Sequence, residues 1–120
     1  MKPYINKTGF GWIEIDGERY EHDILIRPNG EIKKRKKKLS KQIFGTSHTI
    51  SLEEAKHILK KGGEKLIIGT GQSGLVDLSK EAEKYFKKNK CKVKLFRTPE
   101  ATEEWNKTSG EVIGVFHLTC

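Results

Sequence analysis

The chain has 120 residues, of which 34% are hydrophobic and 33% are charged, and its formal net charge at pH 7 is +8. These values are typical of a single globular domain, residues 1–120, that is large enough to bury a core. No apolar run is long enough to span a membrane and no signal peptide is visible, so we expect a cytoplasmic protein. Cys91 and Cys120 are too few for a disulfide framework.

The basic charge raises the question of nucleic-acid binding. Most of it comes from lysine, and the strongest basic feature is the run at residues 33–38. Arginine recognises bases and phosphates better than lysine does, and no aromatic residue interrupts the run for base stacking. Lysines in an exposed edge strand also discourage aggregation, which is the simpler interpretation. Nucleic acid is therefore a disfavoured partner, kept as the third alternative.

The first third of the chain carries strand and turn signals. Residues 10–15 alternate between apolar and polar side chains, and Asp16-Gly17 is typical of a two-residue hairpin turn. Residues 19–22 return from this turn and residues 23–27 continue extended. A turn that contains a proline and a glycine follows, and residues 31–36 pair back as a third strand. We predict that these segments form one antiparallel meander.

Residues 41–50 are predicted to form a long loop, and such loops are often functional, so His48 is a candidate site residue. A helix should then begin at Ser51, since Ser51 and Glu54 have the spacing of a capping box. We expect this helix to end near Lys61. Its predicted buried face consists of Leu52, Ala55, Ile58 and Leu59.

The stretch at residues 65–74 organises the chain. Leu66, Ile67 and Ile68 form an unbroken apolar run, as in a strand that is buried on both faces. The glycines that follow let the backbone turn sharply and let a ligand approach main-chain N–H groups. We predict a small anion at this loop. The simpler interpretation, which we favour for the glycines alone, is that Gly69 and Gly71 only make a tight turn against a neighbouring element.

The same stretch matches the pattern G-x-G-x-x-G, but we do not predict a dinucleotide cofactor. That fingerprint requires a helix that begins at the loop, whereas the best N-cap residue is Ser79. It also requires an acidic residue after the next strand, whereas the predicted strand at residues 91–96 is followed by Arg97. No cofactor is therefore expected.

Helices and strands alternate in the second half of the chain. A helix from Ser79 to Lys88 precedes the strand at residues 91–96, whose predicted buried face holds Cys91, Val93 and Leu95. Another helix begins at Thr98-Pro99, and residues 111–118 form a second unbroken apolar strand. This alternation predicts a parallel sheet covered by helices.

Five short blocks of sequence stand in the order and spacing of one family. They are Tyr20-Glu21-His22-Asp23-Ile24, Gly45-Thr46-Ser47-His48, Leu66-Ile67-Ile68-Gly69-Thr70-Gly71, Arg97-Thr98-Pro99 and His117-Leu118-Thr119-Cys120. On these blocks, nearly the whole chain resembles the Mth-domain family of small uncharacterised proteins, and archaeal members most of all. Its vertebrate relatives include the adipogenesis-associated Mth-domain-containing protein and a mitochondrial complex I assembly factor.

The resemblance implies an α/β fold with three layers: a central mixed sheet, helices on both faces, and a small N-terminal antiparallel β layer. It implies no reaction, because the family is largely without an assigned activity, and its eukaryotic members look like assembly or regulatory factors. We therefore expect a binding or assembly module with a protein partner. A shared fold does not by itself determine function.

The expected ligand crevice lies at the ends of the predicted strands. Arg97 and Thr98 follow one strand as Gly69 follows another, so they should lie beside the glycine loop and complete the anion site. The candidate residues, which include family-like positions, are Gly69, Thr70, Gly71, Gln72, Arg97, Thr98, His48, His117 and Cys120.

A small-molecule enzyme that uses the same crevice is the second alternative. His117 and Cys120 are three positions apart, which places them on opposite faces of an extended strand. His48 could approach Cys120 only through the fold. The histidines and cysteines do not have metal-ligand spacing, so we predict no metal site and assign no catalytic residue.

Overall fold

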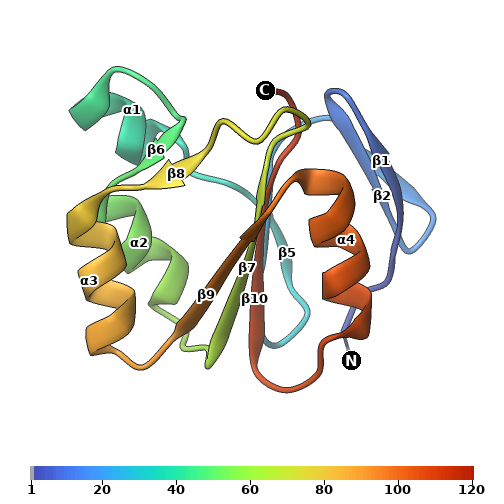
Figure 1. Ribbon diagram of the computed structural model, residues 1–120. Helices are drawn as coiled ribbons and strands as arrows, with labels where there is room; N and C mark the ends of the chain where they lie inside the picture. Colours follow the sequence, from blue (N-terminus) through green and yellow to red (C-terminus); the bar gives the residue numbers. More distant parts are fainter. Residues whose placement is uncertain (1) are drawn as a thin grey trace.

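The fold has three layers arranged around a mixed β-sheet (Figure 1). The computed structural model describes residues 2–120. The strands are β1 (Ile5–Gly9), β2 (Trp12–Ile15), β3 (Glu18–Tyr20), β4 (Ile24–Ile26), β5 (Ile32–Lys34), β6 (Thr49–Ile50), β7 (Lys65–Thr70), β8 (Asp77–Leu78), β9 (Lys92–Phe96) and β10 (Val112–His117). The helices are α1 (Lys38–Phe44), α2 (Leu52–Leu59), α3 (Lys80–Lys88) and α4 (Thr98–Lys107).

The central sheet has five strands in the order β5-β4-β10-β7-β9. Strand β10 lies in the middle, parallel to β7 and antiparallel to β4, while β9 lies parallel to β7 at one edge. Strands β7 and β10 are the two segments with unbroken apolar runs, and both are buried. The prediction of buried parallel strands is confirmed. Strands that are covered on both faces need apolar side chains throughout, which explains the unbroken apolar runs.

Each face of this sheet carries its own apolar cluster. Helices α2 and α3 cover one face, where they meet Leu66 and Ile68 of β7. Helix α4 and the three-stranded β1-β2-β3 sheet cover the other, where they meet Ile67 (Figure 1). The small sheet is held to α4 by hydrogen bonds, among them one from Asn106 Nδ2 to the Ile5 carbonyl at 2.8 Å. The predicted three-layer α/β fold is confirmed.

The predicted N-terminal meander is wrong in its pairing. Strand β1 was not predicted, and it completes the small sheet with β2 and β3. Strands β4 and β5 form a hairpin, as predicted, but this hairpin belongs to the central sheet, because β4 pairs with β10. The Asp16-Gly17 turn is confirmed: both residues have positive φ, at 50° and 82°, as a two-residue hairpin turn requires.

The predicted loop at residues 41–50 is also wrong in part. Its first half belongs to α1, which ends at Gly45 in the left-handed conformation. The buried Ser40 of α1 accepts a hydrogen bond from the Ser51 N–H at 2.9 Å. In the predicted capping box, the Glu54 carboxylate would accept a hydrogen bond from that N–H, but the carboxylate bonds to other groups. The Ser51 hydroxyl does accept from the Glu54 N–H, so the predicted helix start is confirmed.

Some predicted buried faces are more exposed than expected. Leu52 and Leu59 of α2 are half-buried, and Leu95, in the edge strand β9, is 41% exposed. Within residues 2–120, none of the helices has the length and apolar character that crossing a bilayer takes.

Candidate functional site

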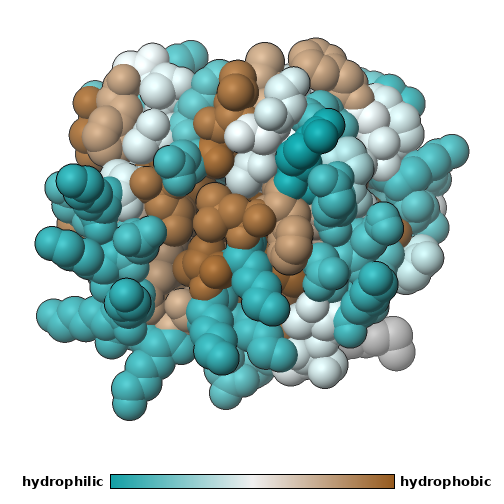
Figure 2. All heavy atoms as spheres, in the orientation of Figure 1, coloured by the Kyte–Doolittle hydropathy of each residue, from teal (hydrophilic) through white to brown (hydrophobic). Residues whose placement is uncertain are grey.

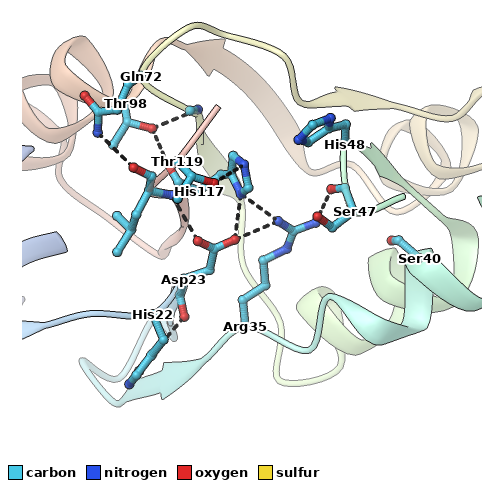
Figure 3. Close-up of polar contacts among 12 residues, drawn as sticks. His22, Asp23, Arg35, Ser40, Ser47, His48, Gln72, Thr98, His117 and Thr119 are labelled. Atoms are coloured by element: carbon cyan, nitrogen blue, oxygen red, sulfur yellow. Dashed lines mark hydrogen bonds and ion pairs between the residues drawn. The ribbon is translucent and has the colours of Figure 1, made fainter. Parts of the chain in front are cut away.

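Polar side chains from distant parts of the chain meet at one edge of the central sheet. The parallel strands β7, β9 and β10 all end there, while the antiparallel β4 begins there. The same edge therefore receives His117 from the end of β10 and Asp23 from just before β4. Arg35, which follows β5, joins them (Figure 3). We call this the carboxyl edge.

His117 lies in a chain of hydrogen bonds that runs from Asp23 to Thr119 (Figure 3). Its Nδ1 is 2.7 Å from Asp23 Oδ2, and its Nε2 is 3.2 Å from Thr119 Oγ1. We assign the Nδ1 proton to the bond with the carboxylate, which leaves Nε2 to face the threonine. Asp23 Oδ1 also accepts from the Leu118 N–H at 3.0 Å.

Arg35 joins two buried carboxylates. Its Nη1 donates to Asp23 Oδ2 at 3.0 Å, while Nε and Nη2 donate to Glu54 at 2.6 and 3.1 Å. Nη2 also donates to the Ser47 carbonyl at 2.9 Å, which holds the chain on the N-terminal side of His48 against the network. Ser40 donates from its hydroxyl to Glu54, whose side chain is fully buried.

The charges in this network are fixed by their partners. Burial acts to raise the pKa of Asp23, but the hydrogen bond and charge of His117, with the Leu118 amide and Arg35, lower it to about 2. Burial acts to lower the pKa of Arg35, but the hydrogen bonds and charges of Glu54 and Asp23 raise it above its ordinary value. Asp23 is therefore ionised at neutral pH and cannot exchange a proton there easily.

The N–H groups of the glycine loop bind other parts of the chain. The Gly71 N–H donates to Thr98 Oγ1 at 2.9 Å, and the Gln72 N–H donates to the Thr119 carbonyl at 2.7 Å. The N–H groups of Ser73 and Leu75 both donate to the Cys120 carbonyl. An anion at these N–H groups would have to displace protein acceptors.

Gly71 is needed for this contact with residues 117–120. Its φ is +107°, and a Cβ atom there would lie 2.3 Å from the Cys120 carbonyl carbon. Gly69 is also tight, since a Cβ atom would lie 2.9 Å from Thr98 Oγ1. The alternative interpretation of the glycines, a tight turn against a neighbouring element, therefore describes the contacts that the loop makes.

Several residues that the sequence nominated do lie together. Thr98 Oγ1 donates to the His117 carbonyl at 2.6 Å, and the His48 ring meets the His117 ring edge-on at 5.5 Å between centroids. Cys120 contributes its carbonyl to the glycine loop. Thr70 donates from its hydroxyl to the Phe96 carbonyl at 2.9 Å.

Arg97 lies beside the glycine loop, as the strand positions predicted. Its Nε and Nη2 donate to the Gln72 carbonyl at 3.2 and 3.0 Å, and its side chain is exposed. It borders a shallow depression of about 540 Å³, which Thr70 and Gly74 also line. Apolar Leu75 and Leu95 and the acidic Asp77 line the same depression.

A second pocket opens directly over the buried network. Its volume is about 210 Å³, and we call it the edge pocket. Asp23, Arg35 and Thr119 contribute to its lining, and His22, Lys34 and Lys37 supply basic side chains. Gly11, Glu21 and Leu118 complete it. Among residues 2–120, no three histidine, cysteine or acidic side chains are grouped to hold a metal ion.

The residues of the buried network other than His117 were not predicted as site residues from the sequence. They are Asp23, Arg35, Ser40, Glu54 and Thr119. A signal did exist for Arg35, because it is the single arginine in a run of lysines, and arginine suits buried bidentate pairs. Asp23 directly precedes an apolar strand, which was a second, weaker signal.

Known structures share this fold over nearly their whole length. A conserved hypothetical protein, PH1505 from Pyrococcus horikoshii OT3, is 34% identical, with a TM-score of 0.91 and full coverage of both chains. The protein MT938 is 25% identical, with a TM-score of 0.84 and coverage of 99% of this chain and 100% of that one. A Mth938-like domain from Bordetella pertussis is 16% identical with a TM-score of 0.64, and the match covers 97% of this chain and 85% of that one.

These similarities confirm the resemblance to the Mth-domain family and to archaeal members. A family model described as a protein of unknown function (DUF498/DUF598) matches residues 5–117. This match covers more than half of the chain, so the chain belongs to the DUF498/DUF598 family.

Proposed function

We propose that the protein is a binding module of the assembly or regulatory kind, and that a small carboxylate or phosphate anion binds in the edge pocket. The observation that carries this proposal is the position of the pocket above the Asp23–Arg35 ion pair, with Lys34 and Lys37 in its lining. Clefts with a few convergent polar groups and a shifted pKa are the default candidates for ligand sites.

The ion pair supports a binding role more than a purely structural one. Burying charges is costly, and apolar residues of similar size often stabilise a fold as well as a buried ion pair does. Here the buried guanidinium and carboxylates are joined by hydrogen bonds beneath the pocket. Lys34 and Lys37 in the pocket lining are exposed, which suits attraction of an anion from solvent.

The anion at the glycine loop stays a prediction, now centred on the exposed Arg97 side chain, because the loop N–H groups have protein acceptors. Two sets of variants separate the sites. Inorganic phosphate and succinate would be titrated into ¹⁵N-labelled protein, and amide shifts would be followed for wild type, Lys34→Ala/Lys37→Ala, Arg97→Ala and the charge control Lys7→Ala.

We expect shifts at Lys34, Lys37 and Thr119, and a Kd that rises about fivefold or more in the double variant because two charge contacts are lost. Lys7→Ala should bind as wild type does, and Arg97→Ala should keep the wild-type affinity of the edge pocket. Loss of binding in Arg97→Ala alone would place the anion at the glycine loop. Equal weakening in all variants, or no binding by wild type, would refute the proposal.

A small-molecule enzyme is the second candidate, favoured by the Asp23–His117–Thr119 chain. This order of carboxylate, imidazole and hydroxyl is the arrangement that activates a hydroxyl nucleophile. With its imidazole neutral, His117 would accept the proton of Thr119 Oγ1 at Nε2 as that oxygen bonds to the acyl carbon of an ester. It would give the proton to the alcohol oxygen as the bond between that oxygen and the acyl carbon breaks. The partly exposed Thr119 lines the edge pocket.

Exposure to p-nitrophenyl acetate followed by peptide mass mapping tests the enzyme candidate. An acetyl group on Thr119, absent in Thr119→Val and retained in Cys120→Ser, would support it. An acetyl group on Cys120 would identify the cysteine as the nucleophile in place of Thr119. An unmodified protein would exclude both nucleophiles for this ester. The cytoplasmic location and a protein partner stay predictions from the sequence.

A further inference from the structure

Strand β9 is an edge strand whose outer side is unpaired within residues 2–120. The Lys92 N–H donates to the Glu64 carbonyl at 2.9 Å, so Lys92 turns its backbone groups toward β7. Backbone groups alternate in direction along a strand. Val93 and Leu95 therefore point their N–H and C=O groups outward, where they can pair with another strand.

The two faces of β9 have different chemistry. On the α3 side, a groove of about 530 Å³ is lined by the apolar residues Leu78, Phe86, Cys91, Val93 and Leu95, with Glu83, Lys87, Lys90 and Lys92 around them. On the α4 side, a smaller hollow of about 290 Å³ has Lys65, Lys92 and Lys94 among its lining residues. Figure 2 shows an apolar patch in the region of β9, bordered by hydrophilic side chains.

We propose that β9 is the docking edge for an extended partner segment in which apolar and acidic residues alternate. Such a segment would add a sixth strand to the central sheet by hydrogen bonds to Val93 and Leu95. Its side chains would alternate between the two faces. The apolar ones would enter the groove beside α3, and the acidic ones would lie next to Lys92 and Lys94.

Charge complementarity selects this partner over a second copy of the chain. If β9 paired with β9 of another copy, Lys92 and Lys94 of both copies would gather on the same face of the joined sheet. Like charges across a strand pair are destabilising, and edge lysines commonly prevent such self-association. An acidic partner turns the same lysines into attractive contacts. The inference is independent of the edge pocket, to which these lysines do not contribute.

The probe is the capped peptide Glu-Val-Glu-Leu-Glu-Val-Glu, titrated into ¹⁵N-labelled full-length protein. We expect the largest amide shifts at Val93 and Leu95, together with slower hydrogen exchange at both. Lys92→Glu/Lys94→Glu should weaken binding about tenfold or more and should instead bind the peptide Lys-Val-Lys-Leu-Lys-Val-Lys. Lys7→Glu/Lys33→Glu, which changes the net charge equally on other strands, should bind as wild type does.

Two further measurements separate strand addition from simple charge attraction. Leu95→Pro removes one outward N–H while the hydrogen bonds to β7 remain, so it should weaken the peptide about tenfold. A peptide of the same composition with all four glutamates first should bind far more weakly. Shifts centred away from β9, equal binding by both lysine double variants, or equal binding of the reordered peptide would overturn the inference.

Discussion

At the scale of single residues, the Asp23 carboxylate accepts three hydrogen bonds within the site. It accepts from His117, Arg35 and the Leu118 N–H. The identities of these partners could not be predicted from sequence, because they lie 12 to 95 positions away along the chain. Only the fold of the sheet brings them to one edge.

The lowered pKa of Asp23 predicts loss of stability in acid. The folded-state pKa is about 2, against an ordinary value of 3.8, so the carboxylate stabilises the fold above about pH 4. This contribution is lost as the pH falls through about 2, and amounts to about 2 kcal/mol. Urea unfolding of wild type and Asp23→Asn at several acidic pH values measures it.

Asp23→Asn should be less stable than wild type at neutral pH but should lose less stability between about pH 4 and pH 2. Asp77→Asn, which removes an exposed carboxylate, is the matched control and should keep the pH dependence of wild type. If Asp23→Asn and wild type lose the same free energy over this interval, the carboxylate does not have the assigned pKa.

At the scale of elements, apolar runs and helix caps were reliable guides. Strands β7 and β10 and the helices that start after Ser51 and Ser79 form where the sequence predicts them. Helix α1 was missed because it has no side-chain N-cap bond and no acidic residue in its first turn. The partner of β4 was missed because strand pairing depends on residues far along the chain.

Thr98 joins three elements through one hydroxyl group, since it accepts from the Gly71 N–H and donates to the His117 carbonyl. Thr98→Val keeps the shape of the side chain but leaves both buried groups unpaired, so we expect a loss of about 3 kcal/mol in unfolding free energy. Urea unfolding measures this loss.

Thr102→Val is the matched change on the same helix. The Thr102 hydroxyl donates to the Pro99 carbonyl one turn earlier, a local contact, and its loss should cost below about 1 kcal/mol. If both variants lose the same stability, then Thr98 does not fix the glycine loop to the end of β10.

At the scale of the whole molecule, the net charge of +8 suggests a larger basic surface for nucleic acid than the fold exposes. Arg35 sits in the basic run, yet its side chain is 1% exposed and bonded to carboxylates. The run therefore presents only its lysines to solvent. These attract phosphates without the bidentate geometry that arginine provides.

We predict weak binding to duplex DNA that depends steeply on salt and not on sequence. Fluorescence anisotropy with two unrelated duplexes at low and moderate salt measures it, and Lys36→Glu/Lys38→Glu should weaken both equally. Tight binding that survives moderate salt, or preference for one duplex, would contradict the prediction, because phosphate contacts alone give neither.

The position of β10 in the sheet also has a consequence for biosynthesis. Gly114 of β10 pairs with Ile26 of β4, about 90 positions earlier, and with Ile67 of β7 on its other side. While the ribosome still holds residues 112–117, β4 and β7 have no strand between them, so the β4–β5 pair and the β7–β9 pair cannot join into one sheet. The central sheet must therefore close after β10 has been translated, and nascent chains stalled before β10 should need a chaperone to stay free of aggregation.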